Sequence, residues 1–310
     1  MNMKYGICLL GAIVLGLAMM AWLYGKEGAA RKAVGVFAPL AIVFGLFGAR
    51  AYALVFSLLG ACPKGPLFSL EPTLYAMSGA VLGVTSACAL AAKKTGASLG
   101  DLADALAPAG MLTIALARCA EVFAEFGGSR AIENGPTFLP LAVQYSDGTW
   151  HMSVFFLEAI FAFAALAYAL NMRTSKPGER FVLTLSFWAS AQVLCESFRE
   201  TTVNLGFIGV QQIQYMAIVL VIMGVYAKIL EQKPYKKKEP TDILCWITII
   251  ECAAAVVLME YAIDHWVLPA ALDYLIMAMA LCGMFMPVRL IVRRALRNED
   301  IPWKEQLKNR

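Results

Sequence analysis

Charged residues are scarce in this chain, and their scarcity excludes a soluble protein. Lysine, arginine, aspartate and glutamate make up 15% of the 310 residues, whereas soluble domains average about 25%. Hydrophobic residues make up 60%. The composition therefore predicts an integral membrane protein.

Histidine is rarer still, and the cysteines show no paired spacing. The chain has two histidines, and its eight cysteines lie almost all within apolar segments. No cluster of histidine, cysteine and carboxylate has the spacing of metal ligands, so the sequence implies no metal and no organic cofactor. The net charge of +4 follows from the loop bias described below and implies no nucleic acid partner.

Long apolar runs are abundant. Each is close to the roughly 20 residues that a membrane-spanning helix needs. Nine such runs predict an all-α, polytopic membrane bundle; they lie at about 5–24, 33–59, 73–92, 104–123, 152–172, 181–198, 208–228, 242–263 and 267–288.

The loops predict orientation and domain organisation. With the N-terminus outside and the C-terminus inside, 20 of the 26 lysines and arginines face the cytoplasm. Positive charge follows the first apolar run, so a retained span is expected rather than a cleaved signal peptide. A basic, proline-flanked cytoplasmic linker at 231–241 divides a seven-span body, 1–230, from a two-span hairpin with a basic tail, 242–310.

Two apolar runs carry charges on one helix face. Arg118 and Glu121 lie late in the fourth run, and Gln192, Glu196 and Arg199 close the sixth with 4-3 spacing. A charge in the hydrocarbon region costs at least about 2.5–3.5 kcal/mol on insertion scales, so it usually faces a polar interior and marks a functional path. These stretches are therefore interpreted as a site.

Other polar residues are expected at the same depth, in the outer half of the bilayer. Arginine binds phosphate through two parallel hydrogen bonds, so a cluster with net positive character predicts an anionic phospholipid head group as ligand. Asp104 lies about 21 Å away along its helix and is expected to cap or anchor it. The additional polar residues at the level of the site are Tyr5, Arg50, Ser78, Gln211, Gln212 and Gln214.

Several short motifs occur in the order and spacing of one known family. They are Tyr5-Gly6, Gly48-Ala49-Arg50, Ala117-Arg118, Glu125-Phe-Gly-Gly128, His151-Met-Ser153 and Glu196-Ser-Phe-Arg199-Glu200 with Gln212 following. On these motifs, residues 4–228 resemble the prolipoprotein diacylglyceryl transferases. The hairpin at 242–288 lies outside the resemblance.

The resemblance implies an enzyme of the bacterial plasma (inner) membrane whose site faces the outer leaflet. Such a transferase moves diacylglycerol from phosphatidylglycerol to the lipobox cysteine of a prolipoprotein, or to a related thiol acceptor. Arg118 and Glu196 are the expected catalytic residues, with His151 as a substitute general base. The expected substrate-binding residues are Tyr5, Arg50, Ser78, Glu121, Glu125, Gly128, Gln192, Arg199 and Gln212.

Three departures from the family pattern keep an alternative open. Ser78 stands where the family has histidine, Gln192 where it has arginine, and Glu121 where it has asparagine. A positioned base typically contributes about 10²–10⁴-fold in rate. The alternative is a non-catalytic paralogue that binds anionic lipid, or a membrane-protein partner docked through 242–288.

Overall fold

Nine long helices make up most of the described chain. The computed structural model describes residues 3–24, 28–58, 65–66, 74–123, 131–132, 137–174, 176–199, 204–205, 208–232, 240–265 and 269–296. Within these ranges the long helices are α1 (Met3–Tyr24), α2 (Gly28–Leu58), α3 (Met77–Thr95), α4 (Leu99–Ala120), α5 (Val154–Asn171), α6 (Glu179–Glu196), α7 (Val210–Glu231), α8 (Pro240–His265) and α9 (Ala270–Leu296).

Each of the nine predicted apolar runs coincides with one of these helices. Seven of them are long and apolar enough to cross a membrane, namely α1, α2, α4, α5, α7, α8 and α9. Helix α3 ends in Lys93 and Lys94, and α6 carries Glu179, Arg180 and Glu196, so these two helices are more polar than the rest. The expected all-α multi-pass membrane architecture is confirmed.

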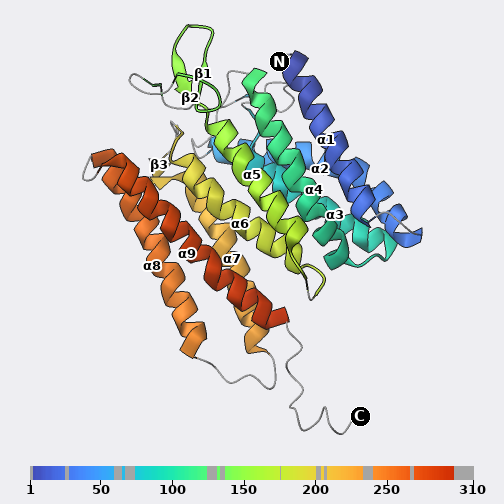
Figure 1. Cartoon of the computed structure of the whole chain (residues 1–310). Coiled ribbons are helices and arrows are strands. Elements are labelled where there is room, and N and C mark those ends of the chain that lie inside the picture. Colours follow the sequence, from blue (N-terminus) through green and yellow to red (C-terminus); the bar gives the residue numbers. More distant parts are fainter. Residues whose placement is uncertain are drawn as a thin grey trace.

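The helices form a layered bundle (Figure 1). Helix α2 packs along α3, α1 along α4, α4 along α5, and α6 along α7, while α9 packs against both α6 and α7. Helices α4 and α6 end, and α1, α5 and α7 begin, at the end of the molecule that carries the N-terminus. Polar residues at those helix ends are therefore brought to one level.

Two short antiparallel sheets and one 3₁₀ turn lie between helices. Strands β1 (Ala142–Gln144) and β2 (Trp150–Met152) pair with Val143 opposite His151. Strands β3 (Asn204–Leu205) and β4 (Ile208–Gly209) pair between α6 and α7, and the turn η2 (Glu121–Phe123) extends α4. In Figure 1 the β1–β2 hairpin lies at the same end of the molecule as the N-terminus.

The buried apolar residues form two clusters. One joins α1 to α4 around Met20, Phe37 and Leu102. The other runs from α4 through α9 and includes Trp188 and Met277, so the C-terminal hairpin shares a core with α6 and α7. The division of the chain at 231–241 stays a prediction, and 233–239 lie outside the described residues.

Asp104 joins the ends of two helices. Its carboxylate oxygens accept hydrogen bonds from the backbone N–H groups of Gly178, at 3.0 Å, and Phe181, at 2.9 Å. Gly178 precedes the first residue of α6, so Asp104 caps the N-terminus of that helix, where backbone donors have no helical acceptor. The expectation that Asp104 caps or anchors its own helix is therefore corrected, because the helix that it caps is α6, while Ser98 caps α4.

Glycine allows α2 and α3 to approach closely. A Cβ atom on Gly83 would lie 1.9 Å from the backbone oxygen of Phe44, and one on Gly48 would lie 2.5 Å from that of Gly79. These backbone atoms belong to rigid helices and cannot move aside as a side-chain tip would. The close approach places α3, and with it Ser78, directly beside α2.

We expect Gly83→Ala to force α2 and α3 apart and to lower the free energy of unfolding by about 1–3 kcal/mol, the usual cost of overpacking. Thermal unfolding in detergent measures it. The matched control is Gly224→Ala in α7, where a Cβ would meet no atom within 4 Å. Because alanine favours helix over glycine, the control should be neutral or slightly stabilising. Equal stability of the two variants would contradict the close-packing explanation.

Candidate functional site

Two arginines and three glutamates form a buried ion cluster where α4, α5 and α6 meet. Glu158 Oε2 accepts a hydrogen bond from an Arg199 terminal nitrogen at 2.7 Å and forms an ion pair with Arg118 Nε at 3.0 Å. Arg118 also pairs with Glu121 at 2.5 Å, and Arg199 lies 3.8 Å from Glu196. The fourth and sixth apolar runs were predicted to bring their charged residues together. The structure shows this for Arg118, Glu121, Glu196 and Arg199.

Glu158 is the member of the cluster that the sequence interpretation missed. It lies on α5 with no exposed surface, and it joins Arg118 of α4 to Arg199, which follows α6. The signal was present, because a glutamate inside the apolar run 152–172 is itself an intramembrane charge. Neither the motifs nor the polar faces of α4 and α6 drew attention to it.

Two glutamine side chains complete the cluster, with their amides oriented to satisfy their neighbours. Gln192 is fully buried; its amide donates to Glu158 Oε1 at 2.9 Å and accepts from the Trp188 indole at 3.3 Å. Gln211, in the first turn of α7, donates to both carboxylate oxygens of Glu196 at 3.0 Å. Glu196 is thus held more lightly than Glu158, by one amide and one distant guanidinium.

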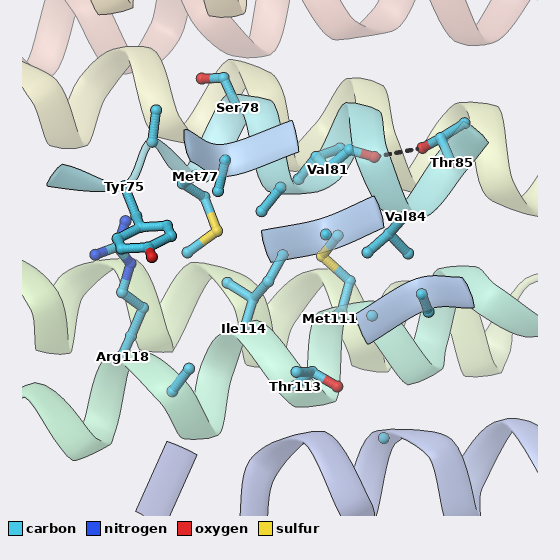
Figure 2. A pocket seen from close by; sticks show the side chains of 18 of the residues that line it. Tyr75, Met77, Ser78, Val81, Val84, Thr85, Met111, Thr113, Ile114 and Arg118 are labelled. Atoms are coloured by element: carbon cyan, nitrogen blue, oxygen red, sulfur yellow. Dashed lines mark hydrogen bonds between the residues drawn. The ribbon is translucent and has the colours of Figure 1, made fainter. Parts of the chain in front are cut away.

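The cluster lies at one end of a large cavity of about 780 Å³. Helices α1, α2, α3, α4, α6 and α7 line it, and most of the lining is apolar. Figure 2 shows Arg118 extending from α4 towards the end where Tyr75 lies, with Val84 and Thr85 at the other end. The polar residues of the lining include Tyr5, Tyr75, Ser78, Arg118, Glu121, Glu196, Arg199, Gln211, Gln214 and Tyr215.

Ser78, which the resemblance matches to a histidine of the family, has no ionisable side chain. It is buried on the first turn of α3, within hydrogen-bonding reach of the buried phenol of Tyr215. Tyr5, also buried, lines the cavity from α1. Helices α1, α3 and α7 therefore each supply a hydroxyl group to the cavity.

Four of the predicted site residues that the structure describes do not line the cavity, namely Arg50, Gln192, Gln212 and His151. Arg50 is buried and donates to the backbone oxygens of Leu74, at 2.8 Å, Gly65, at 2.7 Å, and Pro66. Gln212 lies behind the lining, and its contacts are described below. Arg50 thus ties α2 to the segment before α3 rather than joining the other two arginines.

His151, the expected substitute base, lies on β2 rather than in the lining. Its Nε2 is 2.9 Å from the hydroxyl of Thr149, and its ring stacks on Tyr145 with centroids 4.0 Å apart. Its role as a base stays a prediction to which the geometry adds no support. Glu125 and Gly128 lie outside the described residues.

The charge balance of the cluster differs from the expectation of net positive character. Two guanidinium groups face three carboxylates, and Arg50 is engaged elsewhere. Arg118 Nε is buried 3.0 Å from Glu158 Oε2, so this atom is paired within the cluster.

The part of the chain that the structure describes contains no group of three or more histidine, cysteine or carboxylate side chains arranged to hold a metal ion. The chemistry available at the cavity is therefore that of guanidinium, carboxylate, amide and hydroxyl groups.

The family model and the similar curated proteins carry the same description. The family model described as prolipoprotein diacylglyceryl transferase matches residues 3–230. Similar curated proteins are phosphatidylglycerol–prolipoprotein diacylglyceryl transferases. One from Bacillus cereus (strain Q1) is 27% identical over 247 residues, 74% of this chain and 87% of the relative. One from Streptococcus suis (strain 05ZYH33) is 24% identical over 247 residues, 74% of this chain and 88% of the relative.

Proposed function

This chain belongs to the prolipoprotein diacylglyceryl transferase family, and we propose that it moves diacylglycerol from phosphatidylglycerol to the cysteine thiol of a prolipoprotein. The observation that carries the proposal is a long apolar cavity with a buried ion cluster at one end. Its lining on α1 extends from Tyr5 to Met20, about 22 Å along the helix. The hydrocarbon half of a bilayer is about 15 Å deep, so the cavity is long enough for acyl chains.

In this proposal Arg118 and Arg199 hold the phosphate. Both line the cavity, and Glu158 fixes them from behind with one oxygen shared between them. A planar guanidinium offers phosphate two parallel hydrogen bonds. The same groups stabilise the charge that develops on the departing phosphate.

Glu196 takes the proton of the acceptor thiol. It lines the cavity beside Arg199 and is the carboxylate that the cluster holds most lightly. Proton transfer to Glu196 also removes the excess negative charge of the cluster, leaving two guanidinium groups against two carboxylates. A thiol suits this arrangement because it ionises near pH 8.5, far more readily than a hydroxyl.

The reaction balances without a cofactor. The thiolate sulfur attacks the glycerol carbon that bears the phosphate, forming a carbon–sulfur bond as the carbon–oxygen bond breaks. The bonding pair leaves with the oxygen of glycerol phosphate, and the thiol proton remains on Glu196. The arginines bind and orient the phosphate, and Glu196 accepts the proton. Neither substrate nor protein is oxidised.

We place the site towards the outer leaflet of a bacterial plasma membrane. The support is the distribution of lysine and arginine, which puts the N-terminal end of the bundle outside. The cluster lies at that end, where α4 and α6 finish and α7 begins (Figure 1). A prolipoprotein cysteine exported across the membrane would reach the cluster from the same side.

The proposal predicts selective lipid binding. Purified protein should retain phosphatidylglycerol in preference to zwitterionic phosphatidylcholine, measured by native mass spectrometry after exchange into mixed vesicles. Arg118→Lys should weaken this preference about tenfold, because the lysine keeps a charge for Glu121 and Glu158 but loses the paired donors. Arg294→Lys is the matched control, since Arg294 pairs with Asp242 at 2.7 Å on the C-terminal hairpin. Equal retention of both lipids by the unchanged protein would contradict head-group recognition.

A further inference from the structure

A carboxylate from the C-terminal hairpin lies directly behind the cavity. Glu260 of α8 is buried, and its Oε1 accepts from the hydroxyl of Ser197 and from the side-chain amide of Gln212. That amide also donates to Ser197 Oγ at 2.9 Å. Ser197 follows the last residue of α6, and Gln212 lies in the first turn of α7. One carboxylate therefore holds the end of one helix to the start of the next.

These two residues directly follow two residues of the cavity lining. Glu196 precedes Ser197, and Gln211 precedes Gln212. The Gln211 amide binds both oxygens of Glu196 at 3.0 Å, so two consecutive bridges join α6 to α7. The first bridge faces the cavity, and Glu260 closes the second. Because the residues of the two bridges are adjacent in the chain, holding Ser197 to Gln212 also holds Glu196 and Gln211 in position.

Helix α9 holds the same turn by other contacts. The sulfur of Met277 lies 3.2 Å from Ser197 Oγ, and the ring of Tyr274 stacks on Phe198 with centroids 4.3 Å apart. Residues 197–199 form a turn beyond the end of α6, in which each backbone N–H donates to the carbonyl oxygen three residues earlier. The side chains of the hairpin contact this turn and add to what holds it in place.

We infer that Glu260 is a positioning residue for Glu196 and Arg199, so that α8 and α9 complete the site rather than form a separate module. The inference rests on the proposed function for its catalytic consequence. It concerns helices outside residues 3–230, which the family model matches. Placement matters at this scale because a shift of about 1 Å in a reacting group can cost about 100-fold in rate.

The test compares Glu260 variants in the full-length protein, with kcat expressed per folded molecule. Glu260→Ala should lower kcat about 10- to 100-fold. KM for phosphatidylglycerol should rise by a smaller factor, because Arg199 is displaced while Arg118 keeps its place on α4. Glu260→Gln keeps an acceptor oxygen for Ser197 and Gln212 and should restore most of the rate. Glu251→Ala is the matched control, because Glu251 is an exposed carboxylate of the same helix. It should behave as the unchanged protein.

Hydrogen exchange provides a readout that does not depend on catalysis. The backbone amides of 194–199 and 209–214 should exchange faster in Glu260→Ala than in the unchanged protein or in Glu251→Ala. If the unchanged protein transfers no lipid, the proposed function fails, and exchange alone decides the inference. Unchanged exchange in these segments would overturn it. The inference would also be overturned if Glu260→Ala lowered only the yield of folded protein and left kcat per folded molecule unchanged.

Discussion

Glu196→Gln is expected to lower kcat for lipid transfer by about 10²–10⁴-fold at pH 6.5, because the amide cannot accept the thiol proton. The variant should fold, since the amide replaces the carboxylate isosterically beside Arg199 and Gln211. Its deficit should shrink as pH rises. The thiol ionises in solution without help as pH approaches about 8.5, so the variant gains close to tenfold in rate for each pH unit up to that value.

Glu179→Gln is the control for this experiment. Glu179 lies at the opposite end of the same helix, is equally buried, and pairs with Arg293 at 3.2 Å outside the cavity lining. Its kcat should match that of the unchanged protein at every pH. A Glu196→Gln deficit that stays constant from pH 6.5 to 8.5 would mean that Glu196 orients Arg199 instead of accepting a proton.

Glu158→Ala is expected to have the largest effect on stability. It leaves the guanidinium groups of Arg118 and Arg199 without their shared carboxylate in a buried site. Breaking a buried ion pair by removing one partner typically costs about 3–5 kcal/mol, because the remaining charge is uncompensated. Thermal unfolding in detergent should show a large decrease in midpoint. The transferase activity of any folded fraction should also fall, since both phosphate-binding groups lose their orientation.

Asp242→Ala separates this effect from the general cost of losing an ion pair. Asp242 pairs with Arg294 at 2.7 Å, but both side chains are partly exposed near the end of the hairpin. Its removal leaves one partly exposed guanidinium group instead of two buried ones, so the midpoint should fall less than in Glu158→Ala. Equal destabilisation by the two substitutions would show that Glu158 has no special role in holding the cluster.

The sequence predicts the helices well because the membrane imposes one strong constraint on them. Each predicted apolar run coincides with a helix, since a spanning segment must satisfy its backbone hydrogen bonds internally. The cluster formed by Arg118, Glu121, Glu196 and Arg199 was also predictable, because charges at helical spacing in apolar runs are costly unless they meet.

The rest of the site was not predictable from depth alone. Depth places Arg50 at the level of the other arginines, but it does not specify how far a helix is rotated, and the side chain turns to the carbonyl groups of Gly65 and Leu74. The net charge of the cluster was predicted with the wrong sign, because Glu158 was overlooked and Arg50 was included. Glu260 belongs to a segment that no motif described, so only the packing of α8 and α9 against α6 and α7 places it behind the cavity.

This member of the family, in which the resemblance matches Ser78 to a histidine, is expected to transfer diacylglycerol. The direct measurement incubates the purified full-length protein with phosphatidylglycerol and a lipobox peptide, and follows the peptide by mass spectrometry. The account predicts a peptide that gains one diacylglycerol on its cysteine, with one glycerol phosphate released for each, and no gain on a peptide with serine at that position. Retention of phosphatidylglycerol without any thioether product would contradict the account and indicate a lipid-binding protein that does not catalyse transfer.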